Sequence, residues 1–229
     1  MFRGTIAVMI AALAVSWSGW ALDSSFRDQM VPVRMLGDGG RTIFVSPYEV
    51  TAASWQQCYR EKRCSHMPIV PADSGAYPVT GVNWFDVSEY LAWANARSGI
   101  GLRLPTLAEW RKMDRTLVPP KQAPLFTDPR LAWAANYGQE KSPSGPVRHS
   151  GTFSKTPEGI FDLDGNVWEW TSTCYKPGFE GQDSNMCPAF VAAGEHEAAT
   201  SVFVRDPASG GCATGSPLAH LGFRLVADK

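Results

Sequence analysis

The chain has 229 residues, of which 44% are hydrophobic and 19% charged, and its formal net charge is -1 at pH 7. A net charge this close to zero argues against a nucleic-acid or strongly acidic partner, because binding either would favour an excess of lysine and arginine. A chain of this length can bury one sizeable core, so we expect a single domain.

The first 21 residues have the layout of a secretory signal peptide. Arg3 gives a charged start, residues 5–15 are apolar, and residues 19–21 (GWA) form a small-x-small cleavage site. The apolar stretch is shorter than the roughly 20 residues that a membrane span needs. We therefore expect cleavage after Ala21, a mature domain of residues 22–229 without a membrane span, and a periplasmic or secreted location. An uncleaved N-terminal anchor is the alternative.

Five cysteines suit an oxidising compartment and leave one cysteine unpaired. Cys58 and Cys64 are close in sequence, as are Cys174 and Cys187, so we expect two local bridges with Cys212 free. Sequence alone leaves other pairings open. The chain has no C-x-x-C, which disfavours thioredoxin-like redox chemistry and zinc ribbons.

Three amphipathic helices are predicted in the first half of the chain, and their tryptophans are interpreted as core residues. The first begins at Thr51, which can cap it, and the second follows Asn83, where apolar residues recur on one face. The third follows a capping box at residues 106–109. Short strands are expected at residues 30–36, 42–45, 202–204 and 223–226, and little regular structure at residues 117–151.

The stretch at residues 159–171, GIFDLDGNVWEWT, combines two tryptophans, two glycines and three acidic residues without a helical or strand period. If buried, Asp162, Asp164 and Glu169 need partners, whereas the aromatic residues are too large to leave in water together. A buried turn whose carboxylates and carbonyls converge on a hard cation meets both demands. A tight turn with hydrogen-bonded carboxylates between two core aromatics meets them equally well.

This stretch closely resembles the signature loop of the formylglycine-generating-enzyme family, also called the sulfatase-modifying-factor domain. Three further segments resemble motifs of that family in the same order: residues 77–94 (YPVTGVNWFDVSEYLAWA), 103–110 (RLPTLAEW) and 221–225 (LGFRL). The resemblance implies an α+β fold, a single compact domain with low regular secondary structure that is similar to C-type lectins.

The resemblance also implies a structural calcium ion at the signature loop. Its ligands are the side chain of Asp162, the carbonyls of Gly165 and Val167, and the carboxylate of Glu169. Mixed carboxylate and carbonyl oxygens are the ligands that calcium prefers. A second family calcium site matches residues 136–137, but its carboxylate partner has no clear match here.

The catalytic chemistry of the family is less well matched. Family members that convert a substrate cysteine to formylglycine bind copper(I) through two cysteines, whose thiolates suit this soft ion. The corresponding stretch here keeps only Cys212, and the four histidines are scattered singly, so neither copper nor iron is expected. Cys212, eight residues before His220, is a candidate nucleophile; a buried or simply unpaired cysteine is the alternative.

Three functions are compatible with these features. The first is an exported maturation or accessory factor that acts on another exported protein or on a small-molecule substrate, as do signal-peptide-bearing relatives that assist nitrite reductase or mature a siderophore. The second is a non-catalytic binding module of the same fold, although the lectin calcium motifs E-P-N, Q-P-D and W-N-D are missing. The third is copper-dependent oxidation of a substrate cysteine to formylglycine.

Overall fold

The computed structural model describes residues 25–35, 40–69, 74–114, 146–175, 187–194, 197–205, 212–214 and 220–228. The predicted signal peptide and the position of the second calcium site, residues 136–137, lie outside these ranges. Cleavage after Ala21 therefore stays a prediction. Among the described helices, none is both long enough and apolar enough to cross a membrane.

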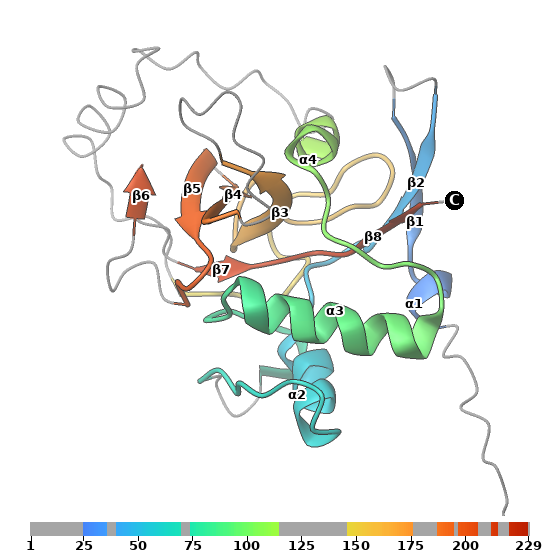
Figure 1. The fold of residues 1–229 in the computed structure, drawn as a ribbon. Coiled ribbons are helices and arrows are strands. Elements are labelled where there is room, and N and C mark those ends of the chain that lie inside the picture. Colours follow the sequence, from blue (N-terminus) through green and yellow to red (C-terminus); the bar gives the residue numbers. More distant parts are fainter. Residues whose placement is uncertain are drawn as a thin grey trace, which may run out of the picture.

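Two sheets and a few helices make up the described fold, which confirms the predicted α+β class (Figure 1). The smaller sheet is antiparallel, with strand order β1-β2-β8. The larger sheet has the order β6-β5-β4-β3-β7, and β7 is parallel to β3. The strands are β1 (Val31–Arg34), β2 (Thr42–Val45), β3 (Trp168–Cys174), β4 (Ala189–Ala193), β5 (Glu197–Ser201), β6 (Cys212–Thr214), β7 (Leu221–Gly222) and β8 (Val226–Asp228).

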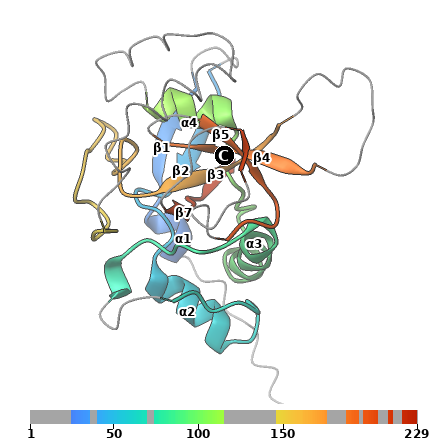
Figure 2. The same ribbon diagram turned by 90° about the vertical axis from the view of Figure 1, so that its left-hand side faces the viewer.

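The helices are α1 (Ser25–Asp28), α2 (Ala52–Arg60), the 3-10 helix η1 (Ser74–Ala76), α3 (Trp84–Ser98) and α4 (Leu107–Asp114). In both ribbon views α2 and α3 lie together on one side of the sheets, and α4 lies on the other side next to β3 (Figure 2). Helices therefore lie on two sides of the sheets.

The predicted caps explain where the three longer helices begin. The Thr51 hydroxyl accepts a hydrogen bond from the Ser54 amide at 3.3 Å at the start of α2. At the start of α3, Asn83 and Asp86 each bind the other's backbone amide in a capping box. Thr106 and Glu109 do the same before α4. Each cap satisfies amides that the first helical turn leaves without a partner.

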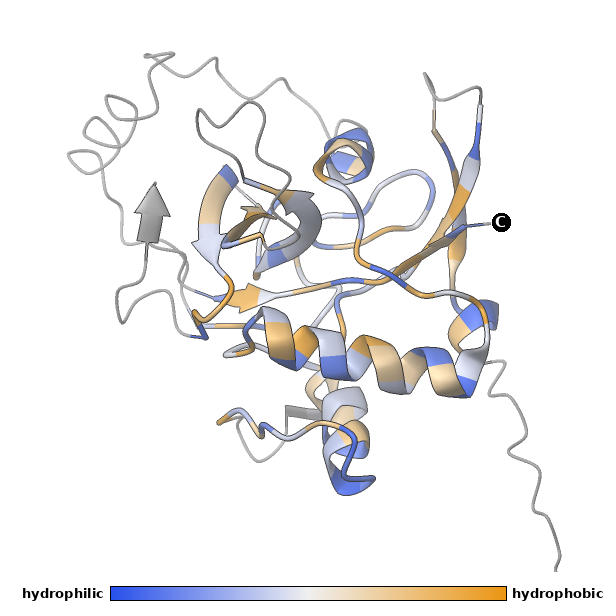
Figure 3. Ribbon diagram, viewed as in Figure 1, coloured by the Kyte–Doolittle hydropathy of each residue, from blue (hydrophilic) through white to orange (hydrophobic). Residues whose placement is uncertain are grey.

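The tryptophans of the helices and of β3 form much of the core, as predicted. Trp55 and Trp110 are buried on α2 and α4, and Trp170 is buried on β3. Apolar stretches recur along α3 with polar stretches between them, as expected for a helix with one buried face (Figure 3). The strand β2 buries alternate residues, Ile43 and Val45, which is the pattern of a sheet with one face on the core.

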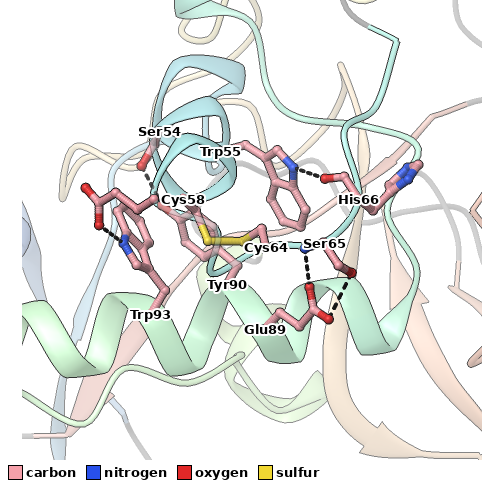
Figure 4. Close-up of a disulfide and its surroundings, with 10 residues drawn as sticks. Ser54, Trp55, Cys58, Cys64, Ser65, His66, Glu89, Tyr90 and Trp93 are labelled. Atoms are coloured by element: carbon pink, nitrogen blue, oxygen red, sulfur yellow. Dashed lines mark hydrogen bonds between the residues drawn. A yellow bond between two sulfur atoms is a disulfide. The ribbon is translucent and has the colours of Figure 1, made fainter.

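The two predicted disulfides are confirmed, because Cys58 is bonded to Cys64 and Cys174 to Cys187. The first bridge lies between α2 and α3, where the Trp55 ring stacks on Tyr90 with centroids 5.5 Å apart (Figure 4). Cys212 begins β6, but its side chain lies outside the described part of the chain. Its role as a free thiol or a nucleophile stays a prediction.

The C-terminal strands differ from the sequence expectation. The predicted strand at residues 202–204 is wrong: β5 ends at Ser201, and the Val204 amide donates to the Ser201 carbonyl in a turn. The predicted strand at residues 223–226 is displaced, because β7 ends at Gly222 and β8 begins at Val226. The β4–β5 pair was not expected, since small residues such as alanine give a weak strand signal.

Candidate functional site

The signature loop turns sharply at two polar residues. Asp162 has φ 62° and Asn166 has φ 72°, both in the left-handed region, which aspartate and asparagine tolerate better than most residues. Ile160 and Leu163 are buried in an apolar cluster with Ile43 and Trp110 and anchor the turn to the core. The loop is thus held by apolar contacts on one side and leads directly into β3.

The carboxylate of Asp162 is fully buried, and backbone amides satisfy it. Its Oδ1 accepts a hydrogen bond from the Phe153 amide at 2.9 Å, and its Oδ2 accepts one from the Gly151 amide. Its own amide donates to the Ser154 carbonyl at 3.0 Å. Asp162 therefore ties the signature loop to the preceding segment, residues 151–154.

Glu169 forms an ion pair with Arg224 in which both side chains are at most 1% exposed. The arginine Nη2 lies 2.6 Å from Oε1 and its Nε lies 2.7 Å from Oε2. The indole of Trp110 also donates to Oε2 at 2.9 Å. This pair joins β3 to the Gly-Phe-Arg motif near the C-terminus, and α4 adds the third partner.

Arg224 also donates hydrogen bonds to backbone carbonyls around it. Its Nη2 donates to the Phe161 carbonyl at 2.9 Å, and its Nη1 lies 3.5 Å from the carbonyls of Ser46 and Pro47. Burial alone would lower the pKa of Arg224, but the neighbouring Glu169 raises it above its usual value. The guanidinium therefore stays charged while it is excluded from water.

Glu49 is a third buried acid beside this pair, and the sequence analysis did not single it out. Neither of its carboxylate oxygens has a hydrogen-bond partner among the described residues. Burial raises the pKa of Glu49 to about 8, although the nearby charge of Arg224 opposes this shift. Glu49 lies two residues before the N-cap of α2 and belongs to no recognisable motif. The local sequence therefore does not indicate that it is buried.

At the calcium site implied by the family resemblance, the Arg224 guanidinium already binds one of the expected ligands, Glu169. Both oxygens of Glu169 already bind Arg224, so a calcium ion at Glu169 would lie beside the guanidinium and be repelled by its charge. Each oxygen of Asp162 accepts one amide and keeps capacity for a second partner. Within the described ranges, no three His, Cys, Asp or Glu residues are grouped so that they could hold a metal ion. Calcium at this loop stays a prediction.

A family model described as "Sulfatase-modifying factor enzyme 1-like domain" matches residues 40–229. The chain is 34% identical over 121 residues to "Inactive C-alpha-formylglycine-generating enzyme 2" of Mus musculus. This match covers 48% of this chain and 35% of that protein. It is 29% identical over 200 residues to the "Formylglycine-generating enzyme" of Mycobacterium tuberculosis, and this match covers 69% of this chain and 59% of that protein. The chain thus spans less than two thirds of the length of either relative.

Two solved structures share the fold at low sequence identity. "Treponema denticola variable protein 1" superimposes with a TM-score of 0.56 and 17% identity, covering 87% of this chain and 95% of that one. PvdO from Pseudomonas aeruginosa superimposes with a TM-score of 0.52 and 17% identity, and the match covers 87% of this chain and 90% of that chain. At this level of identity the likeness concerns the fold alone.

Proposed function

The chain belongs to the formylglycine-generating-enzyme family, whose domain model spans residues 40–229, and we propose that it is an exported maturation or accessory factor. In this proposal it acts on a second exported protein or on a small-molecule metabolite. Relatives of the chain are named as formylglycine-generating enzymes, as a hercynine oxygenase and as an inactive enzyme. Family membership therefore supports both oxidative and non-oxidative versions of such a role.

The observation that carries the exported location is the pair of disulfides. Disulfides form and persist in oxidising compartments and are rare in the cytosol. Both bridges join residues close in sequence, and the Cys58–Cys64 bridge is buried against the aromatic core. A fold with two such bridges is suited to the periplasm or the extracellular space.

A pair of exposed aromatic residues supplies a surface on which a partner could dock. Phe85 on α3 and Phe203 after β5 have ring centroids 5.5 Å apart, and the residues are 51% and 74% exposed. Beside them Arg205 binds both carboxylate oxygens of Asp86, at 2.7 and 2.8 Å. Large side chains exposed together mark recognition surfaces more often than isolated ones do.

Gene deletion followed by mass spectrometry of exported proteins and metabolites tests this role. We expect one exported product to lose a defined mass change in the deletion strain, and the wild-type gene to restore it. The double variant Phe85→Ser/Phe203→Ser should restore it poorly. Tyr59→Ser, a matched control at an exposed aromatic residue on α2, should restore it fully. Unchanged masses of every exported product would refute a maturation role.

A non-catalytic binding module is the second candidate. It is favoured by the signature loop itself, because the buried acids Asp162 and Glu169 both serve hydrogen bonds that hold the fold together. Copper-dependent oxidation of a substrate cysteine to formylglycine is the third candidate. Conversion of a C-x-P-x-R peptide by the purified protein with copper would establish the third and exclude the second.

A structural calcium ion is a separate part of the proposal and rests on the family resemblance. Because Arg224 occupies Glu169, the ion would be held by the Asp162 carboxylate and by the carbonyls of Gly165 and Val167. Elemental analysis of the purified mature protein should find about one calcium per chain, and a chelator should lower its melting temperature. Copper and iron should be absent or unchanged by Cys212→Ser. A calcium-free protein that is indifferent to chelator would show that Arg224 alone serves this position.

A further inference from the structure

A cavity of about 140 Å³ lies where α1, α2 and α3 meet the segment between β2 and α2. Its open side is marked by the exposed residues Gln29 and Tyr48. An engineered apolar cavity of about 150 Å³ binds benzene, so this one has room for a molecule of about six carbon atoms. Much of the remaining wall is apolar or aromatic and includes Phe26, Met30, Pro47, Val50, Leu102 and Leu225.

No charged atom of the described residues that line this cavity faces it. Glu49 is the one charged residue among them, and both of its carboxylate oxygens are inaccessible to water. A charged ligand would therefore exchange its hydration for a wall that offers no opposite charge, which is costly. The cavity thus selects against anions and cations alike and suits a neutral molecule.

Two hydroxyl groups supply the polar part of the wall. The hydroxyl oxygens of Ser54 and Tyr90 lie 2.5 Å apart, so one hydroxyl donates its hydrogen atom to the other (Figure 4). Burial raises the pKa of Tyr90 above its ordinary value, so both hydroxyl groups are protonated and neutral. The pair holds two hydrogen atoms and uses one of them internally. The second hydrogen atom needs an acceptor outside the pair.

The described residues supply no acceptor for this second hydrogen atom. A serine in a helix often donates to the carbonyl four residues earlier, which here belongs to Val50. That carbonyl accepts the Val79 amide at 2.8 Å, and neither hydroxyl makes a further hydrogen bond within the described chain. Ser54 is half-buried on the cavity wall. A ligand oxygen in the cavity would therefore accept this hydrogen atom in place of solvent water.

We propose that the cavity binds a compact neutral molecule whose carbonyl or hydroxyl oxygen accepts the free hydrogen atom of the Ser54–Tyr90 pair. Its carbon skeleton contacts the apolar wall, where the removal of apolar surface from water drives binding. The exposed residues Phe85 and Phe203 do not line this cavity. The proposal therefore adds a ligand site to the function proposed above and does not depend on that function.

Chemical-shift titration of the isotope-labelled, disulfide-bonded protein with cyclohexanone tests the proposal, with cyclohexylammonium chloride as the charged analogue of the same ring. We expect cyclohexanone to cause saturable shifts of the methyl groups of Met30, Val50, Leu102 and Leu225. Cyclohexylammonium should bind more weakly by about tenfold, because its charge finds no partner in the cavity. Equal binding of the two compounds would overturn the proposal, as would the absence of saturable shifts up to the solubility limit of cyclohexanone.

The double variant Ser54→Ala/Tyr90→Phe removes both hydroxyl groups and keeps the aromatic ring. It should weaken cyclohexanone binding by about fivefold, which is the effect of one ordinary hydrogen bond. Ser88→Ala, which removes a serine hydroxyl from α3 outside the cavity, should leave the binding unchanged. Undiminished binding by the double variant would show that the hydroxyl pair does not hold the ligand and would refute the proposal.

A second variant keeps the proposal testable if the double variant does not fold. Gln29→Trp places a large ring at the open side of the cavity, and because Gln29 is exposed the core is not altered. It should weaken cyclohexanone binding by about tenfold. Ser88→Trp, which adds the same ring outside the cavity, should not. Binding that survives Gln29→Trp undiminished would place the ligand elsewhere on the protein and contradict the site.

Discussion

Two arginine–carboxylate networks connect the C-terminal residues to the rest of the fold, one at Arg224 and the other at Asp228. In the first, Arg224 and Glu169 are almost completely excluded from water. In the second, Arg103 and Arg41 bridge the buried Glu109 to Asp228, whose side chain is 54% exposed. The same residue types and similar distances, 2.6 to 2.9 Å, occur in both networks.

The difference between the networks lies in what remains when one partner is removed. At the surface, water and ions replace the lost partner, so an exposed pair contributes about 0 to 1 kcal/mol. In the interior no water is at hand, and an orphaned charge costs about 3 to 5 kcal/mol. The Arg224 network should therefore determine whether the signature loop folds. In the second network the exposed Asp228 should contribute little, and the buried Glu109 should contribute more.

Arg224→Met gives the largest expected effect. It should lower the free energy of unfolding by about 3 to 5 kcal/mol, because Glu169 stays buried and keeps, among the described residues, only the Trp110 indole as a donor. Urea unfolding followed by circular dichroism measures the loss. The double variant Arg224→Met/Glu169→Leu should recover part of it, since neither charge then remains. A loss below about 1 kcal/mol for Arg224→Met would show that water reaches the pair.

Glu109→Gln should have the next largest effect and lower the free energy of unfolding by about 2 kcal/mol. It weakens the charge-assisted hydrogen bonds from Arg103 and the capping-box hydrogen bond from the Thr106 amide. Burial would raise the pKa of Glu109, but the hydrogen bonds from Arg103 and the Thr106 amide hold it below its usual value. Its contribution is therefore present above the unfolded-state pKa of 4.5 and is lost as the pH falls through the folded-state pKa. Acid unfolding of the variant should begin from a lower stability and show a shallower slope.

The helices of this fold are the part that sequence predicts best, because a cap is decided by residues within a few positions of each other. Thr51, Asn83 and the box at residues 106–109 all cap the helices that the sequence assigns to them. The β4–β5 pair is not predicted because its alanines and Glu197 carry little strand signal, and its pairing is fixed by the neighbouring β3. Residues 202–204 (VFV) have a strand composition and nevertheless form a turn, because the Val204 amide donates to the Ser201 carbonyl.

The candidate site follows the same division between local and distant information. That Asp162 and Glu169 are buried and partnered can be expected from the aromatic residues between and around them. Which partner each takes cannot be expected, because Trp110 and Arg224 reach Glu169 across 59 and 55 residues of chain. The Gly222 position illustrates this, since a Cβ atom there would lie 2.7 Å from the Val79 carbonyl oxygen. Only the folded structure brings that backbone close.

Glu49 offers a pH-dependent comparison with Glu109, because its pKa shifts in the opposite direction. Burial raises the pKa of Glu49 from 4.5 to about 8, so the folded state holds its proton more tightly than the unfolded state does. Its contribution to stability is complete below pH 4.5 and is lost as the pH rises through about 8. Between these values the wild-type protein should lose up to about 1.4 kcal/mol per pH unit from this group. Urea unfolding of Glu49→Gln should show a flatter profile in this range, and an unchanged slope would contradict the assignment.

Asp228→Asn should have the smallest effect and gives the sharpest contrast with Arg224→Met. Hydrogen bonds from Arg103 hold the pKa of Asp228 below its usual value, yet the side chain is exposed, so its loss should cost less than about 1 kcal/mol. Salt should remove most of that difference, because the Debye length falls to about 3 Å at 1 M ionic strength. The cost of Arg224→Met should be nearly the same at low and high salt, since ions do not reach the buried pair. Equal salt dependence of the two variants would mean that the two networks do not differ in access to solvent, and that the signature loop is held by its apolar anchors rather than by Arg224.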